Sequence, residues 1–250
     1  SDIDGDALTY SISGGTDILA TVDGSTVSFT APANFNGSET FTATVTDGEY
    51  TSSQTFTVTV NAVNDAPTLS AVDAVNFNED SSTSITLSGS DVDGDDLTYS
   101  VSDGTDIIAT VDGSTASFTA PANFNGSETF TATVTDGEYF SSQTFTVTVN
   151  AVNDAPVLVA VSTVTFDEDG SGATTLSGSD IDGDALTYSI SGGTDITATV
   201  DGSTVSFTAP ADCNDSESFT ATVTDGEYSS SQAFTVTVNA VNDAPTLSAV

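Results

Sequence analysis

The side chains that could do chemistry in this sequence are carboxylates and amides in short recurring phrases. One phrase is Asn153-Asp154, a second pairs Asp180 with Asp182, and a third begins at Asp225. Carboxylate, amide and carbonyl oxygens are the ligands that Ca²⁺ prefers, and it takes about six to eight of them. Zinc sites are instead built mainly from Cys and His. These residue types therefore favour calcium over zinc.

The charge of the chain narrows the classes of function. The 250 residues contain 37 Asp plus Glu and no Lys, Arg or His, so the net charge is −37 with nothing to balance it. Without basic side chains to hold phosphate groups, nucleic acid and anionic membrane surfaces are excluded as direct partners. The carboxylates also repel one another in a compact fold, so divalent cations or high salt must neutralise them.

The sequence is a tandem repeat. A phrase beginning Ser-Asp-(Ile/Val)-Asp-Gly-Asp starts at Ser1, Ser90 and Ser179, which is a period of 89 residues, and VNAVNDAP recurs at the same interval where one copy joins the next. A fixed period means that each copy is one structural unit. The expected domains are 1–66, a first repeat lacking its N-terminal strands; 67–155 and 156–244, two complete repeats; and 245–250, the start of a fourth.

Within a repeat the hydrophobic period is two, which is typical of β-strands. Phe130, Ala132 and Val134 alternate with threonines, and turn dipeptides such as Asp112-Gly113 and Asn125-Gly126 separate the alternating runs. No helix is expected. In the second repeat the sequence predicts seven strands, at about 72–77, 83–88, 97–102, 107–111, 115–119, 128–135 and 143–151.

Seven short strands in a repeat of this size predict an all-β fold, a seven-stranded Greek-key β-sandwich of the immunoglobulin type, repeated along an elongated array. The composition agrees, because 37% apolar residues supply a core and only 15% are charged. The predicted core of the second repeat comprises Leu97, Tyr99, Val101, Phe118, Phe130, Val134, Phe145 and Val147.

Chain direction predicts which loops meet at the linkers. When the seven strands are numbered in order, chain direction places the linker entering a repeat at the same pole as the loops after strands two, four and six. The linker leaving the repeat shares a pole with the loops after strands one, three and five. Carboxylates that are far apart in sequence are therefore expected to converge at each linker.

Four groups of candidate metal ligands follow from this arrangement. Four or five carboxylates brought together without a cation would be strongly unfavourable, although Asp and Asn also form ordinary turns without any ion. We expect the second joint to bind Ca²⁺ most strongly and the group at the N-terminus to bind it least. The candidates are Asn64, Asp65, Asp91, Asp93 and Asp136 at the first joint; Glu79, Asn153, Asp154, Asp180, Asp182 and Asp225 at the second; and Glu168, Asn242 and Asp243, together with Asp2, Asp4 and Asp47, at the two ends.

These phrases resemble the motifs of cadherin repeats. Glu79-Asp80 resembles the cadherin Glu-Asn pair after the first strand, Asp91-Val92-Asp93 resembles the A-x-D-x-D-x-G phrase, and Asn64-Asp65-Ala66-Pro67 resembles the D-x-N-D-N-A-P linker. Asn123-Phe124-Asn125-Gly126 stands where cadherins carry an acidic L-D-R-E phrase, and Ala62 replaces the first linker Asp. The resemblance implies cadherin-like domains with Ca²⁺ held between successive repeats.

The sequence as a whole is more similar to the cadherin-like or immunoglobulin-like tandem repeats of large bacterial surface adhesins than to cadherins themselves. That resemblance implies an extracellular or cell-surface location and the role of a calcium-stiffened spacer or stalk, whose partners are the neighbouring repeats of the same chain. The alternative is a subunit of a self-assembling extracellular filament or sheath, in which like chains pack side by side. No run of residues is long and apolar enough for membrane insertion.

Other motifs are weaker. Asp2 to Asp6 begins like an EF-hand loop, but Ala7 occupies the position of the required glycine. Asn36 and Asn125 begin Asn-Gly-Ser triplets that fit a glycosylation acceptor as well as a turn. Cys213, the single cysteine, stands where the other repeats have Phe and is expected to be a small core residue. An enzyme is not expected, since only paired carboxylates could act as acid and base and no long loop forms a pocket.

Overall fold

A computed structural model describes residues 3–245 of the chain. The chain divides into two compact units, Ser1–Val149 and Asn150–Val250. Every regular element among the described residues is a β-strand, so the all-β prediction is confirmed. In the same residues, no helix is long and apolar enough to cross a membrane.

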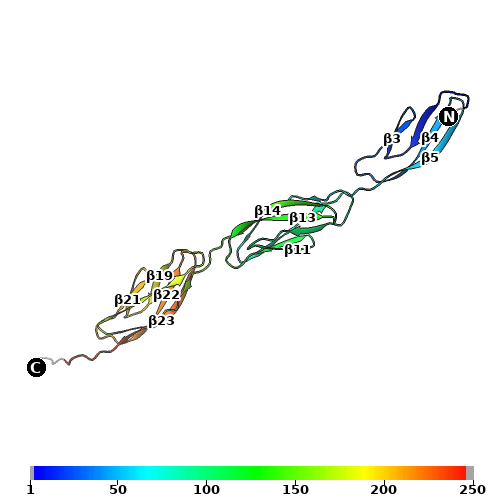
Figure 1. Ribbon diagram of the computed structural model, residues 1–250. Helices are drawn as coiled ribbons and strands as arrows, with labels where there is room; N and C mark the ends of the chain where they lie inside the picture. Colours follow the sequence, from blue (N-terminus) through cyan, green and yellow to red (C-terminus); the bar gives the residue numbers. More distant parts are fainter. Residues whose placement is uncertain (1–2, 246–250) are drawn as a thin grey trace. The chain divides into compact units, whose positions relative to one another are not determined.

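The second repeat is a sandwich of two sheets. One sheet has the order β10-β13-β14-β7 and the other β11-β12-β8, while β6 pairs with β9. In Figure 1, β13 and β14 run side by side, and β11 lies on the other sheet. The strands are β6 (Thr68–Leu69), β7 (Val75–Asn78), β8 (Ser82–Thr86), β9 (Gly89–Ser90), β10 (Thr98–Val101), β11 (Ile108–Asp112), β12 (Thr115–Thr119), β13 (Gly126–Thr135) and β14 (Phe140–Asn150).

The third repeat has the same topology, with sheets in the order β16-β23-β22-β19 and β17-β21-β20 and a short β15-β18 pair. Its edge strand β16 pairs with β23 in parallel, with Val164 opposite Val236. The strands are β15 (Val157–Leu158), β16 (Val164–Asp167), β17 (Ser171–Thr175), β18 (Gly178–Ser179), β19 (Thr187–Gly192), β20 (Thr197–Asp201), β21 (Thr204–Thr208), β22 (Ser216–Thr224) and β23 (Ser229–Asn239).

The first repeat comprises one sheet in the order β1-β4-β5 and the hairpin β2-β3. Its longest pairing joins β4 to β5 in antiparallel register, with Phe41 opposite Phe56. The strands are β1 (Thr9–Gly14), β2 (Leu19–Asp23), β3 (Thr26–Thr30), β4 (Gly37–Thr46) and β5 (Thr51–Val60).

A phenylalanine trio forms the centre of each sandwich. In the second repeat Phe118 packs edge-on against Phe130 with ring centroids 5.6 Å apart, and Phe145 completes the group. Such edge-to-face contacts add to the stabilisation from buried area. Phe207, Phe219 and Phe234 repeat the arrangement in the third repeat. The alternation of apolar residues with threonine therefore places one face of each strand in the core and the other in solvent.

The structure differs from the strand and core predictions in two places. The strand predicted at 72–77 is β7, at 75–78, and the sequence did not predict β6, which pairs with β9 before the chain crosses to pair with β14. Leu97, Tyr99 and Val101 are only half-buried, since they lie beside or in β10, which is an edge strand. Core residues absent from the prediction are Val75, Phe77, Leu87, Ile107, Ala116, Ala132 and Val149.

Candidate functional site

The loop after β9 gathers three carboxylates. Asp91 Oδ1 accepts hydrogen bonds from the backbone N–H groups of Asp93, at 2.8 Å, and Gly94, at 3.1 Å. Gly94 has a φ of 84°, which a glycine adopts without strain and which lets the loop curl around the carboxylate. Carboxylate oxygens of Asp91, Asp93 and Asp95 lie within 4.8 Å of one another, so oxygens from three anionic groups converge on one small volume.

One oxygen in this loop is in an unfavourable environment. Asp91 Oδ2 is buried and has no hydrogen-bond partner, although Asp91 Oδ1 is fully used by the loop. The third repeat shows the same arrangement, because Asp180 Oδ1 accepts from the Asp182 N–H at 2.9 Å while Asp180 Oδ2 is buried without a hydrogen-bond partner. Leaving an ionised oxygen buried and unsatisfied costs free energy, and a cation at this point would remove that cost.

Each linker is bound to the repeat that follows it. Asn64 Nδ2 donates to Asp136 Oδ2 at 3.1 Å, and the Asp65 N–H donates to Asp93 Oδ2 at 2.8 Å. The next linker makes the corresponding contacts, from Asn153 Nδ2 to Asp225 Oδ2 at 3.1 Å and from the Asp154 N–H to Asp182 Oδ2 at 2.8 Å. The structure therefore brings together the linker residues and the loops after the predicted second and sixth strands.

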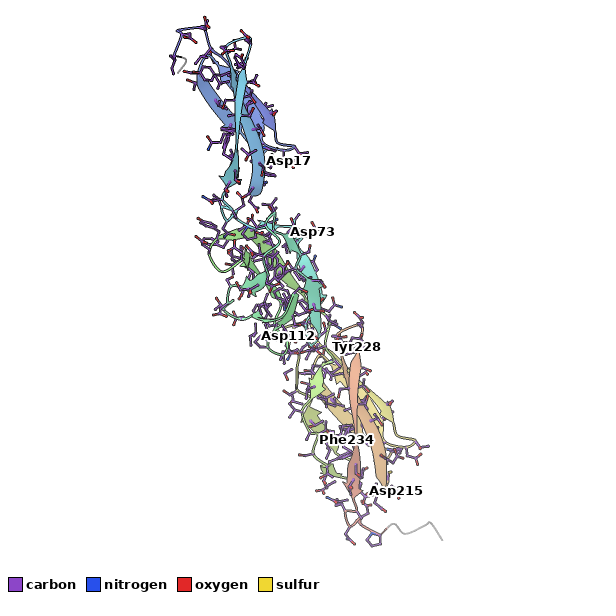
Figure 2. The ribbon with its side chains drawn as sticks, turned by 90° about the vertical axis from the view of Figure 1, so that its right-hand side faces the viewer. Asp17, Asp73, Asp112, Asp215, Tyr228 and Phe234 are labelled. Atoms are coloured by element: carbon purple, nitrogen blue, oxygen red, sulfur yellow. The ribbon has the colours of Figure 1, made fainter. Side chains whose placement is uncertain are left out.

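The turn before the last strand of each repeat holds its aspartate rigidly. Asp225 Oδ1 accepts from the N–H groups of Glu227, at 2.6 Å, and Tyr228, at 2.7 Å. Although partial burial opposes the charge, these bonds and the one from Asn153 hold the pKa of Asp225 below its ordinary value. Figure 2 shows Tyr228 and Asp215 at opposite ends of the third repeat, with Phe234 between them. The Asp225 turn therefore lies at the pole where the linker enters.

Each complete repeat has a buried glutamate at its leaving pole. Glu79 and Glu168 are buried, with 4% and 7% of their surface exposed. Glu168 Oε1 accepts from the Val241 N–H at 2.5 Å, and the Asn242 side chain donates to the Asp243 carbonyl at 3.4 Å. Glu168 therefore binds the chain as it leaves the third repeat.

A second carboxylate group lies at this pole, where Asp169, Asp212 and Asp243 have oxygens within 4.8 Å of one another. The negative charge of Asp212 raises the pKa of Asp243 above its ordinary value, and burial adds to the effect. Asp212 stands where the second repeat has Asn123, and both residues have a positive φ, which Asp and Asn tolerate. The third repeat therefore carries one more negative charge here than the second.

The candidate ligands near the N-terminus are Asp2, Asp4 and Asp47, in the first repeat. Asp2 lies outside the described residues, and Asp4 is exposed. Asp47 forms the same turn as Asp225, since its Oδ1 accepts from the N–H groups of Glu49 and Tyr50. These bonds hold the pKa of Asp47 below its ordinary value.

Sequence analysis missed a structural carboxylate in every repeat. In the second, Glu128 on β13 accepts backbone N–H bonds from Thr105 and Asp106, both at 2.8 Å. Glu39 and Glu217 hold the corresponding loops in the first and third repeats. The only signal in the sequence was the joint recurrence of Gly-Thr-Asp-Ile and Ser-Glu. Asp95, Asp169 and Asp212 were also not among the candidates.

This carboxylate gives a prediction for acid stability. Burial disfavours the charge of Glu128, but the bonds from Asp106 and Thr105 outweigh it, so the pKa of Glu128 lies below its ordinary value in the folded chain. Its contribution is therefore present above the unfolded-state pKa, about 4.3, and is lost as the pH falls through the lower folded-state value. We expect Glu128→Gln to destabilise the second repeat at pH 7, by about 1 kcal/mol, and to destabilise it less at pH 3 than at pH 7.

Chemical denaturation at the two pH values measures this difference. Glu138→Gln is the matched control, because Glu138 is an exposed carboxylate in the same repeat. A loss of the same size at both pH values would contradict the assigned role of the charge.

The sequence profile of the family described as "Bacterial Ig domain" matches residues 1–61, 64–150 and 153–239. The chain therefore belongs to the bacterial Ig domain family, and it contains this domain as a tandem array. Each matched segment covers the strands of one of the repeats described above.

Individual proteins resemble the chain less closely. Chitinase A of Pseudoalteromonas piscicida is 29% identical over 187 residues, which is 73% of this chain but only 23% of that protein. Mouse Protocadherin-24 EC1-3 has a TM-score of 0.52 at 15% identity, covering 92% of this chain and 90% of that one. An endo-fucoidan hydrolase of glycoside hydrolase family 107 matches with a TM-score of 0.33 at 20% identity, over 94% of this chain and 39% of the hydrolase. The protocadherin likeness supports the cadherin-like fold.

Proposed function

We propose that the chain is a calcium-stabilised extracellular spacer, in which Ca²⁺ binds at the pole where each linker enters a repeat. One observation carries the proposal, namely the buried Asp91 Oδ2 and Asp180 Oδ2, which have no hydrogen-bond partner. An ionised carboxylate oxygen can only accept, and the chain has no Lys, Arg or His to donate to it. A divalent cation bound in each repeat would coordinate the buried oxygen there and would reduce the net negative charge.

The oxygens left over by the hydrogen bonds define the proposed site. Asp93 Oδ2 and Asp136 Oδ2 are occupied by the linker. Asp91, Asp93 and Asp95 each have a carboxylate oxygen within 4.8 Å of the others, and Asp91 Oδ2 is buried without a hydrogen-bond partner, so these three residues are the proposed anionic ligands. An all-oxygen set of this kind suits Ca²⁺, with water and backbone carbonyls completing the six to eight ligands. Extracellular calcium modules bind with dissociation constants of about 10⁻⁴–10⁻³ M, which is the range expected here.

A spacer role is supported by the uniformity of the repeats. The second and third copies share one topology, and all three copies share one phenylalanine core. Within residues 3–245, no repeat has a loop of its own that could form a separate active site. We propose that the array belongs to a surface adhesin and displays other domains. The match to 23% of a chitinase fits a spacer that accompanies a different activity in another protein. If like chains instead pack laterally into a filament, electron microscopy will show ordered fibrils rather than single threads.

Asp182→Ala tests the proposed site. We expect the variant to lose at least about tenfold in Ca²⁺ affinity at one class of sites, a loss that corresponds to only 1.4 kcal/mol, and to leave the sites of the second repeat unchanged. Isothermal titration on the full chain measures this. Asp201→Ala, which removes the same charge from the exposed β20–β21 hairpin, is the control. An equal loss in both variants would mean that Ca²⁺ responds only to overall charge.

A further inference from the structure

We propose that Asn64 and Asn153 fasten each linker to the following repeat without any metal, so that bending of the metal-free chain is confined to the residues just before these asparagines. The evidence is a pair of hydrogen bonds made in the same way at two linkers. The Asn side chain reaches the turn aspartate at 3.1 Å, and the next backbone N–H reaches the loop aspartate at 2.8 Å. This inference goes beyond calcium binding and does not depend on it.

The acceptors of both bonds are held in place beforehand. Asp225 is fixed by two N–H groups of its own turn, and the Asp182 backbone is held by Asp180 Oδ1. Because the acceptors are already ordered, the linker loses little further freedom when it docks, and bonds to a charged acceptor are the stronger kind. The linker is therefore expected to stay on the following repeat when Ca²⁺ is absent.

Two further observations place the bend before the asparagine. The compact unit that contains the third repeat begins at Asn150, so it includes the linker. At the leaving pole of the third repeat, Glu168 binds the N–H of Val241, the residue directly before Asn242. At the exit of the third repeat, Glu168 therefore holds the chain up to Val241. At the two linkers that are followed by a complete repeat, the attachment to that repeat begins at the asparagine.

Native-state hydrogen exchange by NMR on the full chain in excess EGTA tests the inference. We expect the Asp154 and Asp65 amides to exchange roughly tenfold or more slowly than the Asp243 amide, whose linker is not followed by a complete repeat in the 250-residue chain. Asn153→Ala should remove most of the protection at Asp154 and leave Asp65 unchanged. Asn242→Ala is the matched control and should change neither amide.

The outcomes separate this inference from the calcium proposal. Protection of Asp154 in EGTA that Asn153→Ala lowers supports the metal-free attachment, whether or not the chain binds Ca²⁺. Exchange of Asp154 as fast as Asp243 in EGTA overturns it. Protection that appears only after Ca²⁺ is added also overturns it, while supporting calcium binding at the linker.

Discussion

Phe130→Ala is expected to lower the free energy of unfolding of the second repeat by about 3–5 kcal/mol. The Phe130 side chain is fully buried and contacts both Phe118 and Phe145, so the truncation leaves a cavity at the meeting point of the two sheets. A domain of this size has a total stability of about 5–15 kcal/mol, which makes this loss a large fraction. Denaturant titration should show one repeat unfolding well before the others, since units in a tandem array have separate intrinsic stabilities.

Phe140→Ser is the matched control for this prediction. Phe140 begins β14, in the same sheet as Phe130 and ten residues later in the sequence. Its side chain has 68% of its surface exposed, and the third repeat has Ser229 at the equivalent position. We expect a change within about 0.5 kcal/mol. If the two variants unfolded at the same denaturant concentration, the assignment of the core face of β13 would be wrong.

Removing Ca²⁺ is expected to produce the second large effect. A ligand that binds only the folded state stabilises it by RT ln(1 + [L]/Kd), which is about 2.7 kcal/mol per site when the free ligand is 100 times its Kd. Thermal unfolding in saturating CaCl₂ and in EGTA should therefore differ by several degrees for the second and third repeats. The first repeat should change least, because Asp4 is exposed and the sequence predicts that the group of Asp2, Asp4 and Asp47 binds Ca²⁺ least.

Salt alone also weakens repulsion in a chain of net charge −37, so NaCl at matched ionic strength is the necessary control. The account predicts that CaCl₂ stabilises more than this control does, and that MgCl₂ stabilises less than CaCl₂, since Mg²⁺ demands octahedral geometry and gives up its water reluctantly. Equal stabilisation by all three salts would mean that the cations act only by screening the negative charges and not by binding at specific sites.

The sequence predicted those parts of the fold that depend on alternation. β13 and β14 are long and alternate strictly, so their core residues Phe130, Val134, Phe145 and Val147 could be identified directly. β6 could not be predicted, because it is only two residues long and its partner is set by the approach of the two sheets. Ile107 escaped prediction because it lies just before β11, where its burial depends on the loop that Glu128 holds.

The sequence also predicted part of the candidate metal site. Chain direction placed the linker residues Asn153 and Asp154 at the same pole as the loops of Asp182 and Asp225, and the structure brings these residues into contact. Which oxygen each residue uses, and that Asp180 Oδ2 is left buried without a hydrogen bond, depends on side-chain rotamers that no sequence pattern specifies. The group that includes Asp169 and Asp212 was missed, because this loop in the other repeats carries Asn34 or Asn123 in place of Asp212.

A crystal structure of the chain grown in CaCl₂, with anomalous scattering used to locate the ions, is the sharpest test of calcium binding where the linkers enter the repeats. We expect ions about 2.3–2.6 Å from Asp91 Oδ2 and Asp180 Oδ2, with the strongest density beside Asp154, Asp180 and Asp182. Ions confined to the faces of the sheets, or Asp91 Oδ2 and Asp180 Oδ2 left without a cation at saturating Ca²⁺, would contradict it.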